Sequence, residues 1–138
     1  MSVRKFKFRM AGVYTGSDNT IRELHYEHLT DNGWQTYDPE NYKAGFLIFL
    51  FALFNCQHMH FRMKSAERNI QVGAVSGELD AEAKEDWSLT RLDVRIEGKR
   101  MAGDPKKDDL DYIVDCMRNC PASTNLKFSN GRTEISFS

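Results

Sequence analysis

A cysteine and two histidines stand close together in an apolar part of the chain, within the segment FALFNCQHMHF at residues 51–61. Cys56, His58 and His60 follow the spacing C-x-H-x-H, and thiolate and imidazole groups are common ligands of zinc. In a strand, alternate residues share one face, so all three side chains would converge. In a helix, Cys56 and His60 lie one turn apart, whereas His58 points to the opposite side. The secondary structure of this segment therefore decides which chemistry is available.

The segment favours a helix. Residues 41–69 contain no proline and a single glycine, and the stretch is far longer than the roughly 10 residues that strands reach. The dipeptide Asp38-Pro39 marks the start, because proline is tolerated in the first turn of a helix. We therefore expect a central helix over residues 39–69.

A helix at this place argues against a metal site. Cys56 and His60 would supply half of a zinc site, and neither His25 nor His28 accompanies a C-x-x-C pair that could complete it. We predict no bound metal and no cofactor. His60 is expected to be a hydrogen-bonded helix residue and His58 to meet solvent or a partner chain, with a role in tuning the Cys56 thiol left open for both.

The first half of the predicted helix is apolar on every side, from Phe46 to Phe54. Such a helix is normally buried all round, and a chain of 138 residues can hardly enclose it. We infer either an obligate homodimer or a helix wrapped completely by its own chain.

A second thiol lies far along the chain, in CMRNCPASTNL. Cys120 stands directly before Pro121, at the expected end of a second helix, where the helix dipole disfavours a thiolate. This position suits a resolving cysteine better than an attacking one. Cys116 is expected to be a small core residue. A disulfide between Cys116 and Cys120 within one helix is geometrically poor, because their Cβ atoms would lie about 5–6 Å apart.

Alternating apolar and polar residues predict most of the strands. KFKFRMAGVY alternates apolar with basic residues, and TIRELHYEHL follows as a second strand. The DNG sequence at residues 31–33 predicts a hairpin into WQTYD. QVGAVSGELDAE is a weaker strand, and in LTRLDVRIEG we expect Leu92, Val94 and Ile96 to face inward.

The second helix is predicted within GDPKKDDLDYIVDCMRNCP. Asp104 is expected to cap it, Pro105 to open it and Pro121 to end it. The closing LKFSNGRTEISFS is expected to form a strand, an Asn-Gly turn and a further strand.

These elements give the order β-β-β-α-β-β-α-β and the fold class α+β. We expect one domain over residues 1–138, as usual for this length. Its parts are an N-terminal β-meander at 1–38, the central helix at 39–69 and a β-β-α-β unit at 70–138.

Composition narrows the partners and the compartment. A net charge of −1 provides no basic surface for nucleic acid or for an anionic membrane. The longest apolar run, Phe46–Phe54, is too short to span a bilayer, and the first residues show no secretory signal. Three cysteines do not form a secreted disulfide framework, so we expect a cytoplasmic protein with no nucleic-acid or membrane partner.

From about residue 43 to 126, the chain resembles the OsmC/Ohr family of thiol-dependent hydroperoxide reductases. The resemblance rests on an apolar helix with a cysteine, two strands, and a helix that ends in NCPASTNL. It implies the OsmC-like fold and an intertwined homodimer with active sites at the subunit interface. It also implies that Cys56 is the peroxidatic and Cys120 the resolving cysteine. A dithiol such as a lipoylated protein would then restore both thiols.

The chain departs from the family where the thiol is activated. Family members carry a Glu early in the long helix, where this sequence has Phe46, and residues 29–45 contain no Arg. Arg22 is the best remaining candidate for the family's catalytic Arg, and Arg22 or His60 would be the positive neighbour that a thiolate needs.

Two functions follow from this comparison. The first is the reduction of organic hydroperoxides by Cys56 and Cys120 in defence against oxidative stress. The alternative is a non-catalytic protein of the same fold that has lost the Arg/Glu pair and binds a small hydrophobic ligand. Its cavity would be lined by Phe46, Phe49 and Phe54.

Overall fold

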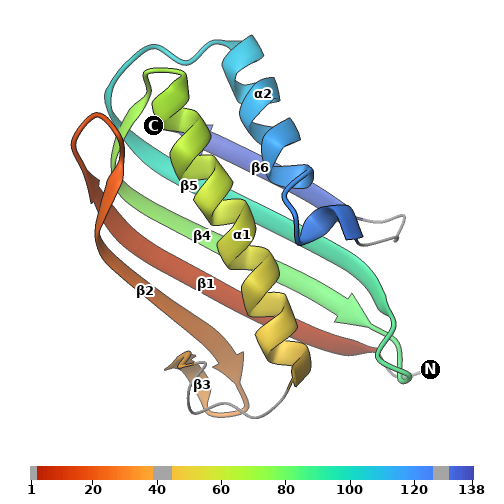
Figure 1. Cartoon of the computed structure of the whole chain (residues 1–138). Helices are drawn as coiled ribbons and strands as arrows, with labels where there is room; N and C mark the ends of the chain where they lie inside the picture. The colour runs from red at the N-terminus through yellow and green to blue at the C-terminus, as the bar shows by residue number, and fades with distance from the viewer. Residues whose placement is uncertain (1–2, 39–44, 126–130) are drawn as a thin grey trace.

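The alternating segments form one mixed sheet, as Figure 1 shows. The computed structural model describes residues 3–38, 45–125 and 131–138. The strands are β1 (Arg4–Thr15), β2 (Thr20–Thr30), β3 (Gly33–Thr36), β4 (Gln71–Ala83), β5 (Leu89–Ala102) and β6 (Gly131–Phe137). They lie in the order β3-β2-β1-β4-β5-β6, and only the β5–β6 pair is parallel. The predicted order of elements along the chain is confirmed.

The helices are α1 (Gly45–Glu67) and α2 (Lys107–Arg118), followed by the short 3₁₀ helix η1 (Ser123–Asn125). Both α1 and α2 cover the same face of the sheet, and α1 crosses the strands diagonally (Figure 1). The predicted start of the central helix, at 39–44, lies outside the described residues, as does the strand expected before the Asn-Gly turn. The helix ends earlier than predicted because Asn69 adopts a positive φ of 61°. No helix among the described residues meets the length and hydropathy that a membrane span requires.

One side of α1 packs into the core against the sheet. Its fully buried apolar side chains are Leu50, Leu53, Phe54 and Phe61. Gly98 of β5 makes room for the last of these, since a Cβ there would lie only 3.2 Å from the Phe61 ring and 2.9 Å from Val72. Leu92, Val94 and Ile96 of β5 face this core, as predicted.

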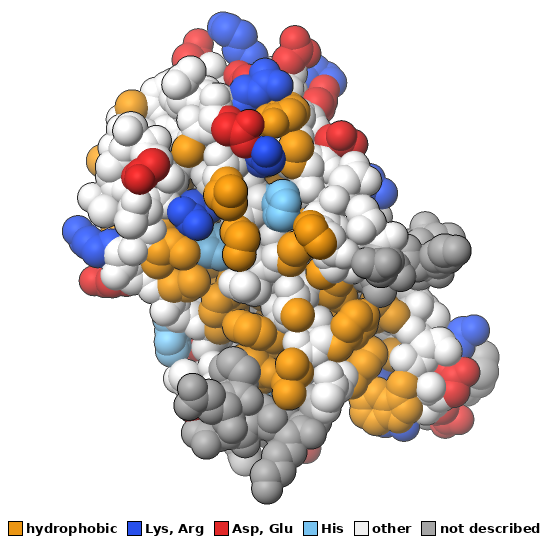
Figure 2. Space-filling view, in the orientation of Figure 1, with side chains coloured by type: hydrophobic (Ala, Val, Ile, Leu, Met, Phe, Trp, Pro, Cys, Tyr) orange, Lys and Arg blue, Asp and Glu red, His pale blue; other side chains and the backbone are white. Residues whose placement is uncertain are grey.

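The opposite side of α1 is exposed, with Ile48, Phe49, Met59 and Met63 each between 37% and 47% accessible. Hydrophobic side chains are correspondingly prominent over α1 in the space-filling view (Figure 2). The expectation of a helix wrapped completely by its own chain is therefore wrong, because α1 keeps a row of exposed apolar side chains on the side away from the sheet.

The start of α2 differs from the prediction. Its N-cap is Lys106 instead of Asp104, and the Asp109 carboxylate accepts a hydrogen bond of 3.0 Å from the Lys106 backbone N–H. Asp104 stays in solvent beside Arg100 and the Lys106 ammonium, because an acidic residue three positions inside the helix caps it instead. The helix also ends earlier than expected, at Arg118.

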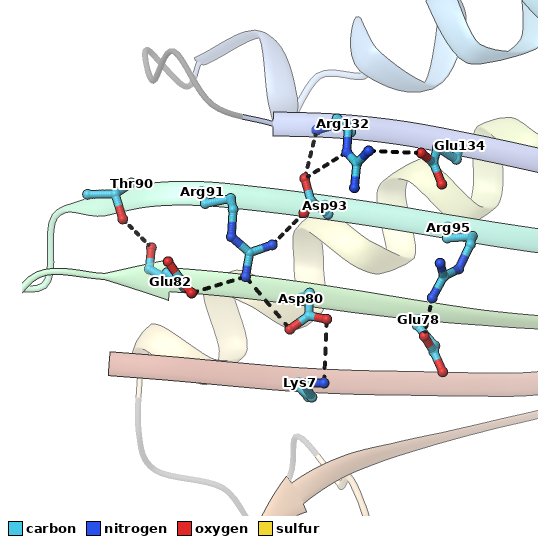
Figure 3. A network of polar contacts seen from close by, with 10 residues as sticks. All are labelled: Lys7, Glu78, Asp80, Glu82, Thr90, Arg91, Asp93, Arg95, Arg132 and Glu134. Atoms are coloured by element: carbon cyan, nitrogen blue, oxygen red, sulfur yellow. Dashed lines mark hydrogen bonds and ion pairs between the residues drawn. The ribbon is translucent and has the colours of Figure 1, made fainter. Parts of the chain in front are cut away.

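The sheet face opposite the helices carries ion pairs across β1, β4, β5 and β6 (Figure 3). Lys7 meets Asp80 at 3.6 Å, and Arg91 bridges from Asp80 to Asp93 on the neighbouring strand. The alternation in LTRLDVRIEG thus places charge on one face and core residues on the other. Such partly exposed pairs each contribute about 0–1 kcal/mol to the free energy of unfolding, so they add little to the stability of the sheet.

His58 is buried at 1% exposure, which corrects the expectation that it meets solvent or a partner. The Tyr14 hydroxyl lies 2.5 Å from Nε2 and the Tyr26 hydroxyl 3.1 Å from Nδ1. Tyr26 donates to Asn55 Oδ1 at 3.2 Å, so Nδ1–H donates to Tyr26 and Nε2 accepts from Tyr14. Burial, together with the nearby charge of Arg62, lowers the pKa of His58 to about 4.

The helical periodicity was sufficient to separate His58 from Cys56, but a helix that is apolar all round does not reveal which side faces the sheet.

The buried neutral His58 predicts a loss of stability in acid. Its pKa is about 4 in the folded chain and near 6.5 when unfolded, so below about pH 6.5 the unfolded state binds more protons. The free energy of unfolding should fall as pH drops from about 6.5 to 4, by up to about 3 kcal/mol from this group. Urea unfolding followed by tryptophan fluorescence measures this.

The H58Q variant should have a flatter pH dependence over this range, although it is less stable at neutral pH. H25Q, which changes an exposed histidine of β2, is the control and should keep the wild-type dependence. An identical acid slope in H58Q and wild type would contradict the assignment.

Candidate active site

The structure brings Cys56 and Cys120 together although they are far apart in sequence. Cys56 projects from α1, and Cys120 lies two residues past the end of α2, which packs beside α1. The two thiols lie near enough for Cys120 to raise the pKa of Cys56, and both are free. The two cysteines that the sequence singled out thus lie near each other, and their roles as peroxidatic and resolving residues stay predictions. The earlier end of α2 means that Cys120 occupies a turn instead of the last turn of a helix.

The turn after α2 supplies backbone donors to both sulfurs. The N–H of Ala122 donates to the Cys56 sulfur, and the N–H of the next residue, Ser123, donates to Cys120 Sγ at 3.4 Å. The carbonyl of Cys120 accepts from Thr124 N–H at 3.0 Å, which closes the turn. Successive amides of NCPASTNL thus donate to the two sulfur atoms.

The electrostatic surroundings of Cys56 disfavour the thiolate. Burial raises the pKa of Cys56, the neighbouring Cys120 thiol adds to this rise, and the Ala122 amide acts in the opposite direction. No cationic side chain in the described part of the chain is among the groups that shift it. A single chain therefore keeps Cys56 protonated at neutral pH.

A chain of polar side chains extends from Cys120 into the core. The Cys120 thiol donates to Ser123 Oγ at 3.0 Å, and Gln57 Nε2 donates to the same oxygen at 3.3 Å. Thr133 Oγ1 of β6 in turn donates to Gln57 Oε1 at 3.0 Å. Gln57 is only 4% exposed, so this network lies inside the protein between α1, the turn and β6.

Sequence reasoning missed this network. Ser123 was within a recognised motif, and Gln57 is a polar residue in an apolar helix, so both carried a signal. Thr133 carried none, because only the parallel pairing of β6 with β5 places it beside α1.

His60 and Arg22 were predicted as neighbours that activate the thiol. The His60 ring binds the main chain, since Nδ1–H donates to the Cys56 carbonyl oxygen at 2.9 Å. Arg22 is exposed on β2, next to an irregularity in its pairing with β1. Neither residue is among the groups that shift the pKa of Cys56. Their roles at the thiol stay predictions.

Phe46 stands where the resemblance calls for Glu, and it belongs to an aromatic cluster. Its ring lies 5.0 Å from Phe6 and 5.3 Å from Trp87, both edge-on, and 6.0 Å from Phe49. Phe54, by contrast, is fully buried against Tyr26. The three phenylalanines expected to line a ligand cavity are therefore divided between the core and the surface. In the described residues, no three His, Cys, Asp or Glu side chains are placed to hold a metal ion.

No protein-family model and no curated protein matches the sequence. Solved structures do match. An OsmC-like hydroperoxide resistance protein from Jannaschia sp. CCS1 is 14% identical with a TM-score of 0.57, over 91% of this chain and 89% of that chain. The chain has the OsmC-like fold.

Two further structures agree. The OsmC-like protein from Mycoplasma pneumoniae is 12% identical with a TM-score of 0.51, over 98% of this chain and 96% of that one. An OsmC-like protein of unknown function from Vibrio cholerae is 14% identical with a TM-score of 0.53, over 98% and 99%. Sequence identities this low show a common fold and do not show a common reaction.

The raised pKa of Cys56 predicts slow alkylation at neutral pH. The rate of iodoacetamide labelling of Cys56, followed by peptide mass spectrometry, should keep rising with pH beyond the point where an ordinary thiol levels off. The same peptide in urea-unfolded protein is the control and should titrate like an ordinary thiol. A rate in the folded protein that is already maximal near neutral pH would instead reveal an activating group.

Proposed function

We propose that this protein reduces organic hydroperoxides with Cys56 and Cys120 as a redox pair. The observation that carries the proposal is that the Cys120 thiol lies near enough to raise the pKa of Cys56, beside a turn whose amides reach both sulfurs. The OsmC-like fold, shared with a hydroperoxide resistance protein, supports the proposal. The structural match to the Mycoplasma pneumoniae protein extends over 98% of this chain, as a single domain would. Three cysteines, an odd number that does not suit a secreted disulfide framework, also support a reducing, cytoplasmic location.

The cycle has three balanced steps. The Cys56 thiolate attacks the terminal oxygen of ROOH, the O–O bond breaks, and ROH leaves after taking up a proton, so that Cys56 becomes a sulfenic acid. The Cys120 thiol then attacks the Cys56 sulfur, forming a disulfide and releasing water. A dithiol, such as a lipoylated protein, reduces the disulfide by exchange and is itself oxidised to a cyclic disulfide.

A homodimer belongs to this proposal. Phe49, Ala52, Cys56, Met59 and Met63 recur at the three- and four-residue spacing of a helix–helix seam. Their side of α1 faces away from the sheet. Four of the five are exposed apolar residues, and Cys56 is partly exposed. A second copy packed on this seam would bury apolar area and place its own side chains beside Cys56, whose thiol has no cationic neighbour among the described residues that shift its pKa.

The seam predicts the effect of a charge on assembly. Wild type should sediment as a dimer, and M59E should weaken dimerisation by about a hundredfold or more, because the seam would bury an unpaired carboxylate. Analytical ultracentrifugation over a range of concentrations measures this. M101E is the matched control, since Met101 is a 62% exposed methionine on β5, and this variant should remain dimeric. A monomeric wild type would contradict the proposal.

The redox pair predicts a specific disulfide. Cumene hydroperoxide added to the reduced protein should produce a Cys56–Cys120 bond, mapped by non-reducing peptide mass spectrometry. C56S should lose turnover, C120S should stop after one equivalent with Cys56 oxidised, and C116S, the control, should retain turnover.

The competing function is the binding of a small hydrophobic ligand without catalysis. It is favoured by Phe46 at the position of the family's Glu and by the raised pKa of Cys56. Absence of the Cys56–Cys120 bond in folded protein, together with a ligand retained in native mass spectrometry, would replace the peroxidase proposal with this one.

A further inference from the structure

We propose that Ser123 is a positioning residue that makes Cys120 the leaving group, and Cys56 the sulfur attacked, when their disulfide is reduced. This inference rests on the redox pair proposed above and concerns the half of the cycle in which an external thiol must choose between two sulfurs.

Ser123 contacts Cys120 twice. Its backbone N–H donates to Cys120 Sγ at 3.4 Å, and its Oγ lies 3.0 Å from the same sulfur. In the reduced protein the thiol donates to this oxygen, whereas a Cys120 thiolate would accept from the hydroxyl, which can rotate. Two donors would then meet a negative charge on Cys120. Hydrogen bonds to ionised groups are stronger than those between neutral ones.

Gln57 and Thr133 fix the direction of these hydrogen bonds. The Thr133 hydroxyl donates to Gln57 Oε1 at 3.0 Å, which orients the amide so that Nε2 donates to Ser123 Oγ at 3.3 Å. With one lone pair of Oγ occupied by this buried amide, the Ser123 hydroxyl proton is free to point at the Cys120 sulfur. The network therefore leaves the Ser123 hydroxyl able to donate a hydrogen bond to the Cys120 sulfur.

The surroundings of Cys56 differ in two respects. In a single chain Cys56 is partly exposed, whereas Cys120 is fully buried, so an attacking thiolate reaches the Cys56 sulfur more readily. The donor to Cys56 is the single Ala122 amide, so charge leaving on Cys56 would be less stabilised than charge on Cys120. Access and leaving-group stabilisation therefore favour the same direction of exchange.

The exchange balances as follows. A thiolate of the dithiol attacks Cys56 Sγ, a Cys56–S–S–R bond forms, the Cys56–Cys120 bond breaks, and the electron pair leaves on Cys120 Sγ. Cys120 then takes up a proton. The second thiol of the reductant attacks its own sulfur in the mixed disulfide, releasing the Cys56 thiolate and a cyclic disulfide. Exchange is faster when the leaving thiolate is stabilised.

The test starts from the disulfide made with diamide, so that it needs no peroxide and no peroxidase activity. Reduction by dithiothreitol should be about fivefold slower or more in S123A than in wild type, because the variant loses the hydroxyl donor to the leaving sulfur. S123T keeps the hydroxyl and should restore most of the rate. T124A is the matched control, since Thr124 Oγ1 in the same turn donates only to the Pro121 carbonyl, and it should react like wild type.

A second readout identifies the attacked sulfur. Brief reaction of the oxidised wild type with glutathione, an acid quench and peptide mapping should place the adduct on Cys56 and leave Cys120 free, whereas S123A should divide the adduct between the two. A wild-type adduct on Cys120, or unchanged S123A kinetics, would overturn the inference. Peroxide inactivity alongside the expected diamide results would instead refute only the peroxidase proposal, whereas failure of diamide to link the two cysteines would refute both.

Discussion

The two apolar sides of α1 are the constraint on which the rest of this structure depends. One side carries Leu50, Leu53, Phe54 and Phe61 into the core against a six-stranded sheet, where Gly98 leaves space for the last ring. The other side is exposed in a single chain and carries Cys56 within its apolar seam. A helix of this kind places a thiol at an apolar surface, and burial there disfavours the thiolate form.

The turn after α2 compensates in part for this environment. It directs the Ala122 amide at Cys56 and the Ser123 amide at Cys120, and it connects through Ser123 to the buried Gln57. Backbone amides are neutral, so they can position the sulfurs and stabilise a thiolate without placing a buried charge beside the apolar side of α1. The two sulfurs nevertheless remain unequal in exposure and in the number of their donors.

The position of Phe46 shows where this chain differs from the chemistry that its fold suggests. An acidic side chain there would lie among Phe6, Phe49 and Trp87, where a carboxylate would be poorly solvated. This chain packs an aromatic ring at that place, and burial raises the pKa of Cys56. The described residues place no cationic side chain that lowers the pKa of Cys56, so under the proposed function a second copy of the chain would supply the activation.

The sequence by itself determined the order of elements and the inward face of β5, and the resemblance carried by NCPASTNL predicted a pairing of Cys56 with Cys120. Alternation and capping are local properties, and NCPASTNL is a contiguous motif. Only the tertiary structure decided which side of α1 faces the sheet, and therefore that His58 is buried between Tyr14 and Tyr26. It also placed Thr133 beside Gln57. The parallel pairing of β6 with β5 brings Thr133 to this position, and no local sequence pattern predicts that pairing. Periodicity defines the angle between residues on a helix, whereas packing against distant strands defines what each side meets.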